Sequence, residues 1–230
     1  MPTNSPIKVL VSVTDNYGIS LYRVKEPHIA LQKLFPDDFE VDIMDTTMIP
    51  WDDLNFFKDY QILFSHRQFV PDNMMEEFCY NMKQINVVTI LDYDDYWELY
   101  KTHPLYHVTR QENMPERLKN NIKCAEWITT TTPVFANYIK EINKNVIVLP
   151  NGVDDGLKQY SGGKNKERDE KVRIMWSGGS SHISDIELLR DSLELLSVDQ
   201  KLKDKFQLHL VGFDLRGNTT NLKLNDGLVE

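Results

Sequence analysis

The chain has very few cysteines. Cys79 and Cys124 are the only two in 230 residues, and they do not form a CxxC pair. This spacing argues against a disulfide scaffold or a structural zinc site. A reducing, cytoplasmic location is therefore expected.

The sequence also lacks long apolar runs and basic clusters. No run approaches the roughly 18 apolar residues that a membrane helix needs, and the polar start Met1–Pro6 does not resemble a signal peptide. The formal net charge is −9, and no run of Lys or Arg offsets it. No transmembrane segment and no general binding to nucleic acid are expected.

Several catalytic signatures are absent. The sequence contains no GxxxxGK[ST] loop, no complete GxGxxG motif and no recognisable Ser-His-Asp arrangement. P-loop NTPase, NAD-dependent dehydrogenase and serine hydrolase functions therefore have no support. The hydrophobic content of 41% and the charged content of 27% are typical of a globular protein.

Residues 1–149 alternate between short β-branched segments and helical patterns. The expected strands are Ile7–Val13, Phe39–Met44, Tyr60–Phe64, Asn86–Leu91, Trp127–Thr130 and Val146–Leu149. The expected helices are Lys25–Phe35, Trp51–Phe57, Pro71–Lys83, Met114–Ala125 and Pro133–Ile142. This alternation predicts an α/β fold with a Rossmann-like, doubly wound parallel sheet.

A hinge and charged linker at 150–171 lead to a second region at 172–230. There, VRIMWSGGSSHISDIELL predicts a strand, a glycine turn and a helix. Ser184 with Glu187 fits a capping box, and Ile183 with Leu188 fits a hydrophobic staple. With one further strand at Gln207–Val211, this is the start of a second Rossmann-like domain, which we expect to be incomplete because so few elements cannot cover both faces of a parallel sheet.

Several segments resemble one enzyme family in order and spacing. These are LDYDDYW followed by HPLY, then TTTTPVFANYI, LPNGVD and VRIMWSGGSSHISDIELL. Together they resemble GT-B fold glycosyltransferases, in particular the large retaining group that includes the glycosyltransferase family 4-like and glycosyl transferases group 1 proteins. The resemblance covers about residues 7–213.

The resemblance implies two Rossmann-like domains facing each other across a cleft. The first would bind the acceptor and the second a nucleotide-sugar, from which a glycosyl group is transferred to a hydroxyl group. The nucleotide-sugar is a co-substrate, and neither a cofactor nor a metal is expected. The acceptor would be a saccharide, a lipid-linked molecule or a protein, and a lipid-linked acceptor would allow peripheral contact with a membrane.

The sequence departs from the family pattern in the donor half. Relatives carry two glutamates eight positions apart near the donor, and no such pair occurs here. Asp185 and Glu187 place negative charge in the first turn of the helix after the glycine turn, which would repel a diphosphate. We therefore expect that turn to contact a sugar, and whether the 230-residue chain is active is left open.

The candidate site residues follow the ends of the predicted strands. For donor binding they are Ser177, Gly178, Gly179, Ser180 and His182; for acceptor binding, Tyr17, Gly18, Ser20, Arg23, His66 and Trp97; for catalysis, Asp92, Asp95 and His103. Carboxylates and histidine can move protons or orient hydroxyl groups. His66 and Arg67 follow the third strand and are similar candidates.

Structural roles remain as alternatives for these residues. Arg23 could pair with Glu26 on its own helix, and Asp94 or Asp95 could cap a helix while the neighbouring aromatics pack in the core. At the level of function, the alternative is a non-catalytic Rossmann-like module that binds a saccharide or a protein partner. The sequence does not define the oligomeric state.

Overall fold

A computed structural model describes residues 5–15, 18–152, 154, 156, 171–179 and 182–212. By their contacts, residues 1–99 and 108–154 form one compact unit, and residues 100–107 group with the chain after 154 in another. Each unit is described by itself. The division at 154 falls inside the segment 150–171 that the sequence predicts as a linker. Two candidate site residues, Tyr17 for acceptor binding and Ser180 for donor binding, lie outside the described residues.

The first unit contains a six-stranded parallel sheet in the order β2-β1-β3-β4-β5-β6. The strands are β1 (Ile7–Val13), β2 (Phe39–Asp45), β3 (Ile62–His66), β4 (Val88–Tyr93), β5 (Trp127–Thr130) and β6 (Val146–Val148). The predicted doubly wound, Rossmann-like α/β fold is therefore confirmed, and the predicted strand positions are correct to within about two residues.

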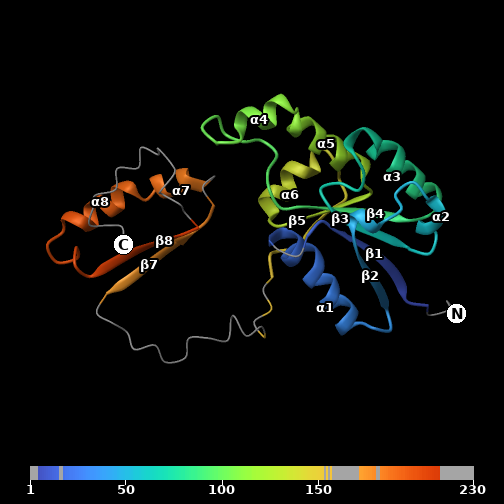
Figure 1. Cartoon of the computed structure of the whole chain (residues 1–230), viewed down its shortest axis with the longest axis horizontal. Helices are drawn as coiled ribbons and strands as arrows, with labels where there is room; N and C mark the ends of the chain where they lie inside the picture. The colour runs from blue at the N-terminus through green and yellow to red at the C-terminus, as the bar shows by residue number, and fades with distance from the viewer. Residues whose placement is uncertain are drawn as a thin grey trace. The chain divides into compact units, whose positions relative to one another are not determined.

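Helices cover this sheet on both sides. They are α1 (Glu26–Leu34), α2 (Leu54–Phe57), α3 (Met75–Gln84), α5 (Met114–Cys124) and α6 (Pro133–Lys140), with a π-helix at Ser20–Lys25 and 3₁₀ turns at Thr46–Met48 and Asp72–Met74. Figure 1 shows α1 on one side of the sheet and α3, α5 and α6 on the other. Helix α4 (Tyr106–Gln111) begins within the segment 100–107 and falls in a stretch that the sequence predicts only as polar.

The strands divide their side chains between two apolar clusters, as a period of two requires. Leu10, Leu63 and Leu91 belong to the larger cluster, which includes residues of α3 and α5, such as Phe78 and Ile122. Val9, Val11, Val13, Val24 and Phe64 form the smaller cluster on the α1 side. Full burial of each such side chain is worth about 1.5–3 kcal/mol, so the larger cluster contributes most of the hydrophobic stabilisation.

The first helix begins earlier than the predicted Lys25, because a π-helix at Ser20–Lys25 leads into α1. The Glu26 N–H donates to Leu21 O, five residues back. Pro27 lacks an N–H and would clash with a carbonyl four residues back, so a widened turn accommodates it. Burial lowers the pKa of His28. The neutral ring can then donate from Nδ1 to Val24 O at 2.6 Å.

The second unit contains a separate two-stranded parallel sheet of β7 (Val172–Ser177) and β8 (Phe206–Val211), with Val172 opposite Phe206. Between these strands lie α7 (Ile183–Glu187) and α8 (Arg190–Val198). The predicted single helix is thus broken in two. Ile186 and Leu193 are buried and form its apolar side.

The predicted cap of that helix is wrong in detail. Ser184 lies inside α7, which begins at Ile183 after His182, so Ser184 cannot be the N-cap residue. The staple partner Leu188 is 82% exposed and lies in the turn between α7 and α8.

Across the described ranges, no helix has the length and apolar character needed to cross a membrane.

Candidate functional site

The strand order of the first unit creates a topological switch point at one position on the sheet edge. Strand β1 has β2 on one side and β3 on the other. The connections that leave β1 and β3 therefore run in opposite directions along the sheet. Connections from the carboxyl ends of such strands diverge to opposite faces, and α/β proteins commonly bind ligands there. The candidate site is therefore expected after Val13 and His66.

A polar cluster occupies the carboxyl ends of β3 and β4. His66 Nε2 lies 2.8 Å from Asp94 Oδ1, and Arg67 Nη2 donates to the same oxygen at 2.9 Å. Arg67 Nη2 also donates to Asp95 Oδ2 at 2.8 Å. The Asp95 side chain is 71% exposed, whereas that of Asp94 is 12% exposed. We refer to His66, Arg67, Asp94 and Asp95 as the switch-point cluster, because His66 and Arg67 stand at the end of β3, one of the two strands that flank the switch point.

Asp94 is ionised within this cluster. Burial alone would raise its pKa, but the hydrogen bond from His66 and the charge of Arg67 outweigh burial and hold the pKa well below the ordinary value. An ionised carboxylate can orient an imidazole ring and keep one tautomer in place. Asp94 therefore positions His66, while Asp95 is the more accessible carboxylate.

The backbone of Arg67 is held in an uncommon conformation. Its φ of 63° lies in the left-handed region, which costs a non-glycine residue about 1–3 kcal/mol. Tyr93 Oη donates to Arg67 O at 2.8 Å, and Asn121 Nδ2 lies 3.4 Å from the same oxygen. The Arg67 N–H donates to Asp92 O at 3.1 Å. Tyr93 and Asn121 thus fix where the Arg67 side chain leaves the backbone.

Sequence reasoning identified only part of this cluster. It selected Asp92 and Asp95 from the acidic trio and gave less weight to Arg67 and Asp94. The distinguishing signal is strand position: Asp92 lies inside β4, whereas Asp94 is the first residue beyond it. Tyr93 and Asn121 gave no signal, because their contacts join elements that are distant in sequence.

The predicted catalytic role of Asp92 is wrong. Asp92 is 0% exposed, and Arg23 binds it through Nε to Oδ2 at 2.9 Å and Nη2 to Oδ1 at 2.6 Å. Thr129 Oγ1 donates to Asp92 Oδ1 at 2.6 Å. A carboxylate enclosed in this way cannot touch a substrate.

Arg23 is likewise committed to the protein interior. Its Nη1 donates to Leu149 O at 2.7 Å and to Asn151 Oδ1 at 2.9 Å, and the residue is 8% exposed. Arg23 therefore joins the π-helix, β4 and the chain leaving β6. The predicted contact with an acceptor is wrong, and so is the alternative pairing with Glu26.

The structure also reassigns three other acceptor candidates. Ser20 is 4% exposed, and its hydroxyl is bonded to that of Thr14 at 2.8 Å. Gly18 has a φ of 52°, in the left-handed region that favours glycine, so the backbone conformation accounts for a glycine at this position. Trp97 is 6% exposed and packs against Phe135 at a centroid distance of 5.6 Å. Trp97 therefore belongs to the core and cannot stack on a sugar. The alternative role of Asp94 or Asp95 as a helix cap is wrong, because no helix directly follows either residue.

His103 lies in the segment 100–107, which groups with the second unit. Its Nδ1 accepts from the Leu105 N–H at 3.1 Å, and its ring lies edge-on to Tyr100 at 5.4 Å. The first unit therefore does not contain His103, and its catalytic role stays a prediction.

The glycine turn after β7 is explained largely by packing within the second unit. A Cβ atom on Gly178 would lie 2.6 Å from the Trp176 ring, and the Gly178 N–H donates to Val211 O at 3.1 Å. His182 is exposed and lies 3.1 Å from Asp185 Oδ2. Ser177 and Gly179 are also exposed. Donor binding at this turn remains a prediction for the exposed residues.

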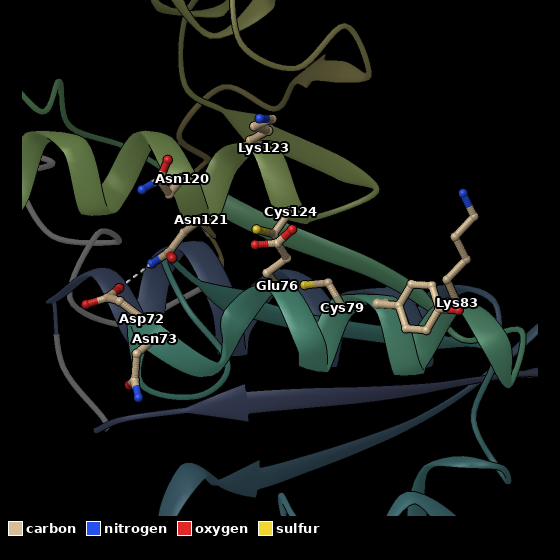
Figure 2. Close-up of a pocket in the computed structure, with 10 residues that line it drawn as sticks. Asp72, Asn73, Glu76, Cys79, Lys83, Asn120, Asn121, Lys123 and Cys124 are labelled. Carbon is tan, nitrogen blue, oxygen red and sulfur yellow. Dashed lines mark hydrogen bonds between the residues drawn. The ribbon is translucent and has the colours of Figure 1, made fainter.

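The first unit also contains several hollows, including one beside α3 and one beside α1. One, of about 470 Å³, lies between α3 and α5 and contains both free cysteines. Figure 2 shows Asn121 bonded to Asp72 at one end of it and Lys83 at the other. Burial raises the pKa of Cys79 to about 12, so this thiol is not a reactive nucleophile. The other, of about 760 Å³, lies between α1 and the chain after β6.

The residues described by the structure contain no group of three or more His, Cys, Asp or Glu side chains that could hold a metal ion. Comparison of the chain with models of protein families finds no match, and comparison with curated protein sequences also finds none.

Proposed function

We propose that this chain is a glycosyltransferase of the GT-B type. Its first unit would hold the acceptor, and its second region would contribute to the site for a nucleotide-sugar. The observation that carries the proposal is the switch-point cluster, because it gathers a histidine and two carboxylates at the carboxyl ends of β3 and β4, beside the switch point of a Rossmann-like sheet. The ordered motifs LPNGVD and WSGG and the separate parallel β7–β8 unit support it.

The proposed reaction exchanges one bond at the anomeric carbon for another. The bond from that carbon to the diphosphate oxygen breaks, and a bond to an acceptor hydroxyl oxygen forms with retention of configuration. The acceptor hydroxyl gives its proton to Asp95, which is exposed, and the nucleoside diphosphate leaves. Asp94 and Arg67 hold His66 and Asp95 in place, so the acceptor meets a fixed arrangement of charges.

A titration calorimetry experiment on the purified 230-residue chain tests the proposal. UDP, GDP, ADP and their glucose conjugates are titrated separately, followed by methyl pyranosides. Saturable binding of at least one nucleotide and its conjugate is expected. Binding of a pyranoside with no affinity for any nucleotide would overturn the transferase proposal and favour a non-catalytic saccharide-binding module.

A further inference from the structure

A shallow groove adjoins the switch-point cluster in the first unit. It has a volume of about 320 Å³ and lies between the chain that follows β4 and the start of α6. The residues that line it include Asp94, Asp95, Tyr96, Thr131, Val134 and Tyr138. The groove therefore combines carboxylates, a hydroxyl group and aromatic rings on one surface.

Two tyrosine rings form the aromatic part of the groove. Tyr96 is 45% exposed and Tyr138 is 48% exposed, and their centroids are 5.2 Å apart. Buried neighbours fix Tyr96, because its ring lies 4.9 Å from Trp97 and 6.1 Å from Phe135. The two rings thus present an apolar surface whose position is set in advance, which reduces the entropy cost of binding.

The polar part of the groove is also fixed in place. Arg67 holds Asp95 through Oδ2, and both hydrogen bonds to the Asp94 carboxylate end on Oδ1. The lowered pKa of Asp94 keeps that carboxylate ionised near neutral pH. Carboxylates accept strong, charge-assisted hydrogen bonds from hydroxyl groups.

The charge of this surface selects among ligands that stack on aromatic rings. Two carboxylates face a single guanidinium, Arg67, so a phosphate-bearing ligand such as a nucleotide would be repelled. A neutral ring with several hydroxyl donors and one apolar face matches both parts of the groove. A pyranose has these properties.

We infer that the groove binds a pyranose ring of a neutral saccharide, with its apolar face on Tyr96 and Tyr138 and its hydroxyl groups on Asp95 and Thr131. This inference rests on the proposed function only for the identity of the ring as the acceptor sugar. Binding itself requires neither the nucleotide nor the transfer step.

The test is an NMR titration of the full chain, which measures the Kd of each of three glycosides. These are methyl α-glucopyranoside, methyl α-mannopyranoside and methyl β-galactopyranoside. The wild-type chain is expected to bind at least one of them with a Kd in the millimolar range. Tyr138→Ala and Asp95→Asn should each weaken binding by at least about fivefold, because each removes a stacking surface or a charge-assisted hydrogen bond. Both positions are exposed, so both variants should fold, as circular dichroism would verify.

Tyr80→Ala is the matched control. Tyr80 is 62% exposed on α3 and lines the separate hollow between α3 and α5, so its removal should leave the Kd unchanged. The inference is overturned if the wild-type chain binds none of the three glycosides at tens of millimolar. It is also overturned if folded Tyr138→Ala and Asp95→Asn bind as the wild type does.

These outcomes separate the inference from the proposed function. Binding that depends on Tyr138 and Asp95, without any sugar transfer, would leave the groove assigned and the transferase proposal wrong. Transfer with an acceptor KM that Tyr138→Ala leaves unchanged would support the transferase and refute the groove.

Discussion

At the scale of single residues, the buried pair Arg23–Asp92 separates structural carboxylates from accessible ones. The two side chains are 7% and 0% exposed, and every guanidinium nitrogen of Arg23 donates a hydrogen bond. A buried pair of this kind is costly to break, because removal of one partner leaves the other charge uncompensated. Its role is to fix the chain after β6 against β4.

Asp92→Asn should therefore destabilise the first unit strongly. The amide cannot accept both bonds from Arg23, so we expect the free energy of unfolding to fall by about 3–5 kcal/mol. Urea denaturation followed by circular dichroism measures the change, and the exposed Asp37→Asn should leave the urea midpoint unchanged. An Asp92→Asn variant of wild-type stability would contradict the structural role.

Asp94 should make stability sensitive to acid. Its pKa is lowered in the folded chain, so the unfolded chain takes up the proton first as the pH falls. The stabilisation is fully present above the unfolded value of about 4 and is lost as the pH falls through the lower folded pKa. Urea midpoints measured across this acidic range should fall more steeply for the wild type than for Asp94→Asn. Equal slopes would show that Asp94 gains no net stabilisation from His66 and Arg67.

The same residues show how far sequence reasoning reaches. The end of β4 could be found as a site because carboxylates that follow a buried strand collect at the sheet edge. The choice among Asp92, Asp94 and Asp95 could not be made, because it depends on where the strand ends and on Arg23, which is 69 residues away from Asp92. The burial of Trp97 depends on Phe135 in the same way.

At the scale of elements, glycines decide how β7 and β8 end. Gly212 has a φ of 89°, and a Cβ atom there would lie 2.4 Å from Gly178 O. Gly178 in turn leaves room for the Trp176 ring. The glycines in WSGG were predicted to allow close approach of a ligand, whereas the approach seen at Gly178 is made by the protein itself.

Gly212→Ala should loosen the second unit locally. The strained φ alone costs about 1–3 kcal/mol, and the contact with a backbone oxygen adds to that cost. Hydrogen–deuterium exchange should therefore be faster in peptides that cover β7 and β8. Gly152→Ala is the control, because no atom lies within 4 Å of a Cβ built there. Wild-type exchange rates in Gly212→Ala would contradict the described turn.

Helix starts were the elements hardest to predict. Pro27 marks a first turn in sequence, yet the chain is already helical before it, because a π-helix accommodates the missing N–H. Ser184 and Glu187 fit a capping box, yet α7 begins two residues too early for it. In both cases the backbone hydrogen bonds, which local sequence does not define, override the side-chain signal.

At the scale of the whole molecule, the sheet is predictable because its strands are β-branched and alternate with helices. The six-strand order places His66 and Asp94 on neighbouring strand ends, and this adjacency creates the switch-point cluster. The two units each have their own sheet, so a substitution in one unit is read out by measurements on the elements of that unit.

Transfer of a sugar to a hydroxyl acceptor is the activity that we propose for this chain. The most direct measurement is the release of nucleoside diphosphate from UDP-, GDP- and ADP-sugars by the full chain, with and without the pyranoside that binds best. We predict release that increases with the pyranoside, yields a new glycoside, and falls at least about tenfold in Asp95→Asn, as loss of a proton acceptor requires. The absence of acceptor-dependent release from every nucleotide-sugar, or equal release by Asp95→Asn, would contradict the proposed transferase function.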